Sequence, residues 1–291
     1  MESKVIKHRD WISQADQFTR KVKRWTDPYR TQKSRGIKHP VHDFLFSYYS
    51  YPMGKLESWH PGLDNILEVP KPKQFNPKHY REINGAFFLD PTLIPEERIP
   101  KLKWVLNMLE STQNRPANFS CFGLHEWAMV YKSNNIRHRE AAPLRLSQAA
   151  TNEVVEQRTI RCSHYDAYRF FTPSSVNMNK LKPEYETRID FEQPGCLHTN
   201  MDLYKWSYKL SPLISSELIW KCFLLAKDVR ELDMRASPYD LSQYELSPVE
   251  IETKQGREEY EKLQRKLSKQ AQPLRQELIS QLMTLIQISH G

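Results

Sequence analysis

The stretch from Ser211 to Arg235, SPLISSELIWKCFLLAKDVRELDMR, carries the clearest secondary-structure signal in the chain. Apolar residues recur in it every three or four positions, which places them on one face of an α-helix. These residues are Ile214, Leu218, Cys222, Leu225, Val229 and Leu232. Ser211 is a favourable N-cap residue, and Pro212 suits the first helical position. The pattern therefore predicts a helix over 211–235.

The same spacing predicts helices elsewhere, and it favours a mainly α protein. They are expected over 8–34, 41–49, 101–112 and 123–132, and over 255–288 as two helices broken near Pro273. Only 8 glycines occur in 291 residues, and neither a dinucleotide-binding glycine motif nor a P-loop is present. We expect a single irregular helical domain with many loops, made of a basic helical N-terminal segment (1–40) and a helical core domain (41–291).

The positive charge of the chain is concentrated at its N-terminal end. The net charge is +8, and residues 1–40 hold 11 Lys and Arg against 4 Asp and Glu. The densest run is RKVKR, Arg20–Arg24. Basic residues interleaved with aromatic ones can hold phosphates and stack on bases, so a nucleic-acid partner is expected; a solvated helix face is the alternative. The aromatic residues are Trp11, Phe18, Trp25 and Tyr29.

The composition of the chain also bears on its location. The N-terminus has no apolar stretch, and no run of eighteen apolar residues occurs, so we expect no signal peptide and no membrane contact. The four cysteines form no CxxC motif. A cytoplasmic protein with reduced thiols is the expectation.

Two segments combine residues that carry chemistry, and both are expected to begin helices. They are RCSHYDAYRFFTP (Arg161–Pro173) and QPGCLHTNMDLYKW (Gln193–Trp206). His164 and Asp166 lie in the first, and His198 and Asp202 in the second. If the two helix starts meet at a cavity, these four side chains are candidate catalytic residues for acid–base work.

Both aspartates also have a purely structural interpretation. Ser163-x-x-Asp166 and Thr199-x-x-Asp202 have the form of capping boxes, in which the carboxylate would bind the backbone at the start of its own helix. Neighbouring side chains are candidates for substrate binding, although aromatic residues at such positions commonly belong to the core. These candidates are Tyr165, Tyr168, Arg169, Lys205 and Trp206.

A metal site is a second use for the same residues. His164, Asp166, His198 and Asp202 offer nitrogen and carboxylate ligands, and Glu126 of the HEW sequence is a possible fifth. The spacing typical of zinc sites is missing, and the ExxH motif of di-iron bundles occurs only at Glu57–His60, in a predicted loop. Cys162 and Cys196 each precede a histidine by two residues, so each is either an activated thiol or a buried inert one.

Several long strings resemble a bacterial family, abundant in actinobacteria, whose members are commonly named 3-methyladenine DNA glycosylase. They are HPVHDFLFSYYSYPMGKLESWHPG (39–62), RCSHYDAYRFFTP (161–173), QPGCLHTNMDLYKWSYKLSP (193–212) and AKDVRELDMRASPYDL (226–241). The resemblance implies removal of alkylated purines from DNA. It assigns no catalytic residue by motif, because the chain has neither a glycine-rich helix–hairpin–helix string nor a paired Cys and His zinc clip.

Glycosylase chemistry requires an extruded, stacked base and a carboxylate near the sugar. Asp166 or Asp202 suits the carboxylate role, and His164 or His198 suits the positioning of water. Arg161, Arg169 and Arg188 are candidate phosphate contacts.

Two other functional classes remain open. One is a helical metal-dependent enzyme, mononuclear or di-iron, acting on a small cyclic substrate. The other is a non-enzymatic nucleic-acid-binding protein.

Overall fold

The computed structural model describes residues 4–63, 65–68, 75–133 and 142–290 of the chain. The fold is mainly α, with 58% of the described residues in helices and 7% in strands. The fold class expected from apolar periodicity and low glycine content is confirmed.

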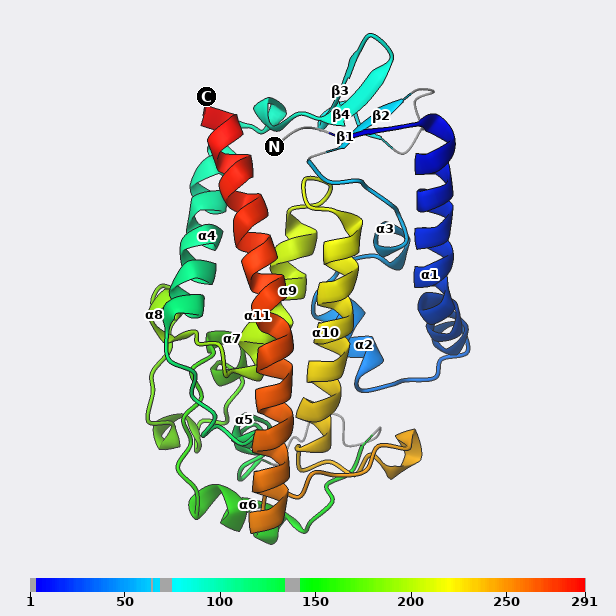
Figure 1. Cartoon of the computed structure of the whole chain (residues 1–291). Coiled ribbons are helices and arrows are strands. Elements are labelled where there is room, and N and C mark those ends of the chain that lie inside the picture. Colours follow the sequence, from blue (N-terminus) through cyan, green and yellow to red (C-terminus); the bar gives the residue numbers. More distant parts are fainter. Residues whose placement is uncertain (1–3, 64, 69–74, 134–141, 291) are drawn as a thin grey trace.

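Four long helices form the centre of the molecule (Figure 1). They are α4 (Ile99–Asn114), α9 (Leu197–Lys209), α10 (Ser216–Arg235) and α11 (Lys254–His290). α9 packs along α10, and α11 packs against α4, α9 and α10. Residues 197–207 of α9 are all buried, because its neighbours surround it. A helix enclosed in this way directs its polar side chains into the protein interior, and those side chains supply half of the site described below.

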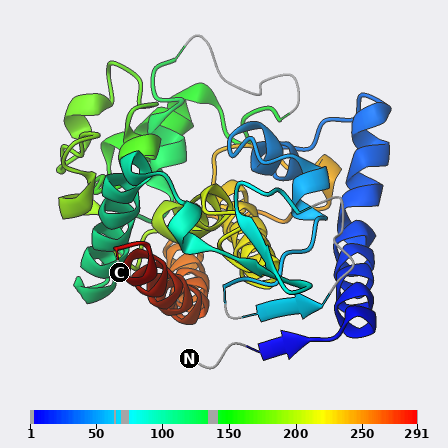
Figure 2. The ribbon, with the colours of Figure 1, turned by 90° about the horizontal axis from the view of Figure 1, so that it is seen from above.

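α1 (His8–Ser34) forms one flank of the molecule, as the view in Figure 2 also shows. α2 (His42–Ser47) and α3 (Met53–Leu56) lie between α1 and α10. The predicted helix over 8–34 is confirmed. Trp11 and Phe18 are buried in the main core and Tyr29 is buried beside α2, while the half-buried Trp25 packs against the core with its ring 4.7 Å from that of Phe223. They are therefore not available to stack on bases.

A small sheet closes one end of the bundle near both termini (Figure 1). Its strands are β1 (Lys4–Ile6), β2 (Asn65–Glu68), β3 (Tyr80–Ile83) and β4 (Ala86–Leu89), in the order β1-β2-β4-β3. β1 runs parallel to β2, and the other pairs are antiparallel. The sequence did not predict these strands, because segments of three or four residues are too short to show alternation.

Short helices and loops cover the other end of the bundle. They include α5 (Leu124–Ala128), α6 (Gln148–Glu156), α7 (Tyr165–Tyr168) and α8 (Arg188–Phe191). Single turns of 3₁₀ helix occur at Pro91–Leu93, Glu96–Arg98, Val176–Met178 and Ser242–Tyr244. α5 carries His125 and His164 directly precedes α7, and both histidines belong to the site described below.

Two predicted helix boundaries were wrong. The helix predicted to begin at Ser211 begins at Ser216, because the hydroxyl of Ser215 caps it by accepting the N–H of Leu218 at 3.3 Å. Ser211 and Pro212 precede it and are joined by a cis peptide bond. α11 also continues through Pro273 instead of breaking there, because packing against three helices holds both halves in line.

The exposed surface of α1 keeps its basic character. Arg20, Lys23 and Arg24 are exposed and have no ion-pair partner within the described residues, whereas Lys21 pairs with Glu217 at 2.6 Å. Within the same described part of the chain, no helix has both the length and the apolar character needed to cross a bilayer.

Candidate functional site

The two histidine and aspartate segments meet in the interior of the protein. His164 precedes α7 and Asp202 lies on α9, and His164 Nε2 is 3.3 Å from Asp202 Oδ2. The imidazole rings of His164 and His198 are 5.3 Å apart between centroids. The expected convergence of the two segments is confirmed, and it joins side chains that are 38 residues apart along the chain.

The capping-box interpretation was wrong for both aspartates. The residues before α7 and α9 make no side-chain capping bond. Asp166 instead accepts from Arg188 Nη2 and Lys205 Nζ, both at 3.2 Å. Asp202 binds Lys205 Nζ and accepts from the hydroxyl of Tyr49 at 3.2 Å. The charged donors Arg188 and Lys205 form stronger bonds to a carboxylate than neutral backbone N–H groups do, and they replace the expected capping bonds.

Two buried cations hold this part of the site together. Lys205 bridges Asp166 and Asp202, and Arg188 bridges Asp166 and Glu192, whose Oε1 lies 3.0 Å from the guanidinium. Burial raises the pKa of Asp166 and Asp202, but the nearby charges of Lys205 and His164 outweigh it and hold both pKa values below their ordinary range. Both aspartates are therefore ionised at neutral pH.

A second charged group lies beside the first, on α5 and α10. His125 Nε2 is 2.7 Å from Asp233 Oδ1, and Arg230 joins Asp233 at 2.6 Å to Glu126 at 2.8 Å. The rings of His125 and His198 are 4.6 Å apart between centroids, so the two groups form one continuous polar interior.

The two neighbouring histidines, His125 and His198, have opposite protonation preferences. Burial lowers the pKa of His198 to about 3, so His198 is neutral at physiological pH. Burial also disfavours charge on His125, but the Asp233 carboxylate prevails and raises the pKa of His125 well above its ordinary value. His125 is accordingly an imidazolium in the folded protein.

Five residues of the polar interior were not among the residues predicted for the site. They are His125, Arg188, Glu192, Arg230 and Asp233. Arg188 was considered only as a phosphate contact, yet it is 3% exposed and faces inward. The spacing of Arg230 and Asp233 could have indicated a buried charged pair. The two residues are three apart, which places both charges on one side of a helix that is largely apolar.

Three of the five predicted metal ligands fall into two separate groups, which they share with residues that were not predicted. One consists of His164, Glu192 and Asp202, and the other of His125, His198 and Asp233; within each, one ligand atom from every residue lies within 4.8 Å of the others. The two remaining predicted ligands belong to neither group, because Glu126 pairs with Arg230, and Asp166 with Arg188 and Lys205. Both three-residue groups have the donor types that divalent transition metals accept.

A pocket of about 310 Å³ opens onto this interior, and we call it the Asp166 pocket. Its polar lining comes from Asp166, Glu126, His198 and Arg230. Its apolar walls include Phe44, Tyr48, Phe170 and Tyr239, of which Phe44 and Tyr48 are stacked with centroids 4.8 Å apart. The buried residues His164 and Asp202 lie behind the pocket and do not line it.

None of the five predicted substrate-binding residues lines the Asp166 pocket. Arg169 pairs with Asp166 at 3.4 Å from outside the pocket, and Lys205 is committed to its two aspartates. Tyr168 donates its hydroxyl to the carbonyl of Val176, and the ring of Tyr165 packs against Tyr185. Trp206 lines a different pocket, of about 290 Å³, beside Lys209 and Val105. The aromatic walls come instead from α2 and from residues that follow α7 and α10.

Comparison with known proteins gives no family or relative for this chain. No family model, no curated protein and no solved structure matches it.

Proposed function

We propose that this protein is a DNA-repair hydrolase that cleaves the N-glycosidic bond of alkylated purine bases of the 3-methyladenine type. The observation that carries the proposal is an ionised carboxylate, Asp166, at the edge of an aromatic-walled pocket of about 310 Å³. The resemblance of four long segments to a family named for this activity points to the same reaction.

The pocket suits a single planar heterocycle. Its volume lies at the lower end of the range for small-molecule sites, so one base fits better than a dinucleotide. Phe44, which is stacked on Tyr48, and Phe170 form aromatic walls beside a bound ring, while Glu126 and Arg230 offer an acceptor and a donor to its edge. An alkylated purine is cationic, and such aromatic and acidic walls favour a cation.

Asp166 would act at the sugar. Departure of the base leaves an oxocarbenium-like centre, which an ionised carboxylate stabilises. Lys205 and Arg188 fix the position of Asp166, and Asp202 in turn fixes Lys205. His198, neutral and on the pocket wall, can accept a hydrogen bond from the attacking water. Asp202 and His164 thus serve as supporting residues in this proposal.

The nucleic acid would bind across exposed cations. Arg169 lies beside the pocket, and Arg20, Lys23 and Arg24 lie on α1. A base within a duplex must be extruded before it can enter the pocket. The proposal places the protein in the cytoplasm, where its free thiols remain reduced.

The test measures base release from DNA methylated with methyl methanesulfonate. Asp166→Asn is expected to lower the rate about 100-fold or more, in line with the removal of other preorganised electrostatic groups. Asp190→Asn, a change at an exposed aspartate of α8, is the matched control and is expected to retain the native rate. Equal release by the native chain and Asp166→Asn would remove Asp166 from the mechanism, and no release by the native chain would refute the proposed function.

A metal-dependent enzyme acting on a small cyclic substrate is the second candidate. One observation favours it: His164 is 1% exposed, and neither of its ring nitrogens makes a hydrogen bond to any residue that the structure describes. Its Nε2 lies 3.3 Å from Asp202 and 3.8 Å from Glu192, an arrangement that a bound divalent cation would satisfy. Elemental analysis of protein purified without chelators tests this candidate. One equivalent of zinc, manganese or iron, lost in His164→Gln, supports it, and metal-free native protein argues against it.

A further inference from the structure

A chain of three side chains links a thiol to a buried carboxylate. Cys121 Sγ lies 3.5 Å from His125 Nδ1, and His125 Nε2 lies 2.7 Å from Asp233 Oδ1. One ring nitrogen therefore faces a nucleophile while the other faces an orienting acid, which is the arrangement that activates cysteine in covalent catalysis. Arg230 holds the second carboxylate oxygen of Asp233 at 2.6 Å.

The imidazole of this chain is held in a fixed orientation. His125 is 2% exposed and Asp233 is fully buried. The backbone between Cys121 and His125 turns through Gly123, whose φ is +72°, and a Cβ there would lie 3.2 Å from Ala236 Cβ. The ring therefore keeps Nδ1 toward Cys121 Sγ and Nε2 toward Asp233, and an imidazole placed in this way can take the proton of the thiol.

Cys121 differs from Cys162 and Cys222 in access, because those two are buried, and it differs from the equally half-buried Cys196 in lining a pocket. Burial raises the pKa of Cys196 to about 11 and that of Cys222 to about 12, and it also raises the pKa of Cys162. Cys121 is partly exposed and lines a pocket of about 770 Å³. This pocket, which we call the Cys121 pocket, shares no lining residue with the Asp166 pocket.

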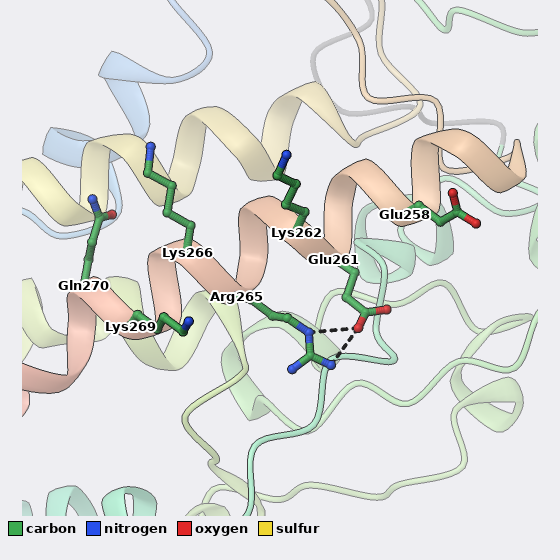
Figure 3. A pocket seen from close by; sticks show the side chains of 7 residues that line it. All are labelled: Glu258, Glu261, Lys262, Arg265, Lys266, Lys269 and Gln270. Carbon is green, nitrogen blue, oxygen red and sulfur yellow. Dashed lines mark hydrogen bonds and ion pairs between the residues drawn. The ribbon is translucent and has the colours of Figure 1, made fainter.

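The charged lining of the Cys121 pocket has a small positive excess, with three arginines (Arg115, Arg161 and Arg265) against Asp190 and Glu261. Arg161 lines it, is exposed, and has no ion-pair partner within the described residues. Arg265 and Glu261 of α11 line both this pocket and an open surface groove along α11, shown in Figure 3. Lys262, Lys266 and Lys269 are exposed along that groove. All seven lining residues of the groove come from one helix, so it is an open approach to the Cys121 pocket and not an enclosed site.

We propose that Cys121 is the nucleophile of a second active site, which hydrolyses acyl esters or thioesters that carry an anionic group. His125 is its acid and base, Asp233 is a positioning residue for His125, and Arg161 attracts the anionic end of the substrate. This activity is independent of the proposed glycosylase function.

The reaction balances with water as the only co-substrate. The Cys121 thiolate attacks the carbonyl carbon, forming a C–S bond while the carbonyl electron pair moves to oxygen. The tetrahedral intermediate then collapses and breaks the bond to the leaving group, which takes a proton from the His125 imidazolium. Water, losing a proton to His125, attacks the resulting thioester. The thiolate leaves and the carboxylic acid is released.

The primary test uses mono-4-nitrophenyl glutarate, with neutral 4-nitrophenyl butyrate as the matched probe. The full chain should release about one equivalent of nitrophenolate in a burst, and peptide mapping should place the glutaryl group on Cys121. Acylation should be faster with the glutarate than with the butyrate. Equal labelling of Cys121 and Cys196, or a rate at Cys121 no higher than that of free cysteine, would overturn the proposal without any substitution in the protein.

Variants then separate the roles of the four residues. Cys121→Ser should abolish the burst, and Cys196→Ser should retain it. His125→Asn should slow acylation about 100-fold. Asp233→Asn should lower kcat and leave KM unchanged, a split that a general loss of structure would not produce. Arg161→Gln should reduce only the preference for glutarate, by roughly twofold to fivefold. A burst retained in Cys121→Ser would contradict the proposal.

Base release from methylated DNA distinguishes this site from the proposed glycosylase site. Cys121→Ser should release bases at the native rate, and Asp166→Asn should be acylated at the native rate. Loss of both activities in either variant would mean that the two pockets do not act independently, and this part of the inference would then be wrong.

Discussion

Replacing Lys205 with methionine would remove one of the cations that hold the polar interior together. Lys205 is 8% exposed and binds Asp202, which is 1% exposed, together with Asp166 at 3.2 Å. Removing one member of a buried ion pair costs about 3–5 kcal/mol, because the other charge is left without compensation. Asp202 keeps its hydrogen bond from Tyr49 and lies 3.7 Å from Arg188, so we expect the lower end, about 3 kcal/mol.

Urea unfolding at pH 7, followed by circular dichroism, measures this loss. Lys21→Met is the matched control, because Lys21 and Glu217 form an ion pair of 2.6 Å in which both side chains are more than two-fifths exposed. An exposed pair contributes about 0–1 kcal/mol, so the control should unfold close to the native midpoint. A loss below about 1 kcal/mol in Lys205→Met would contradict the reasoning, since it would equate the buried pair with an exposed one.

A second substitution tests whether the uncompensated charge is the cause. In the Lys205→Met background, Asp202→Asn removes that charge, and we expect it to restore about 1–2 kcal/mol of the free energy of unfolding. If the lost packing of the lysine stem were the cause, the double variant would be no more stable than Lys205→Met. That result would refute the electrostatic account.

The pH dependence provides an independent check with a defined sign. In the native protein the pKa of Asp202 is lowered, so its contribution to stability is present above its unfolded pKa and is lost as the pH falls through its folded pKa. Without Lys205, burial should raise the folded pKa of Asp202 above its unfolded value. Lys205→Met should then approach the native protein in stability between pH 7 and pH 5, by at most about 1.4 kcal/mol per pH unit.

Two further predictions concern His198 and α11. Because the pKa of His198 falls to about 3 on folding, the contribution of His198 to stability is lost as the pH drops below its unfolded pKa of about 6.5. His198→Gln should therefore reduce the acid-induced loss of stability by about 1.4 kcal/mol per pH unit between pH 6 and pH 5. Urea unfolding measures this, and parallel stability profiles of the native protein and the variant would contradict it. Pro273 is exposed within α11, so Pro273→Ala should restore a backbone hydrogen bond without disturbing the core. We expect the free energy of unfolding, measured in urea, to rise by about 2 kcal/mol. An unchanged midpoint would show that the helix has already adapted to the proline.

The candidate site was predictable in part. The spacing of His164, Asp166, His198 and Asp202 indicated two segments rich in polar chemistry, and the structure joins those segments. The sequence did not show which aspartate reaches a pocket, since both bind Lys205 and only the packing of the surrounding elements leaves one of them open. Asp166 reaches the pocket, and Asp202 is enclosed behind it.

The sequence did not predict that His125 would link Cys121 to Asp233. Cys121 and His125 are four residues apart, a spacing that alone permits contact, but Asp233 lies 108 residues after His125. The sequence instead indicated Cys162 and Cys196 as candidate thiols, because each precedes a histidine by two residues. Both prove to have pKa values raised by burial, since close spacing in the chain does not direct a thiol toward a ring nitrogen.

Local patterns alone determined that this protein is mainly α and where most of its helices run, because apolar spacing and capping act within a few residues of one another. They also determined that basic residues cover α1. Tertiary structure alone decided that α11 continues through Pro273, that Asp166 binds buried cations of α8 and α9 instead of a helix start, and that Cys121 faces an imidazole held by Asp233. Each of these outcomes depends on packing and charge contacts between elements distant in the chain, and no local spacing records them.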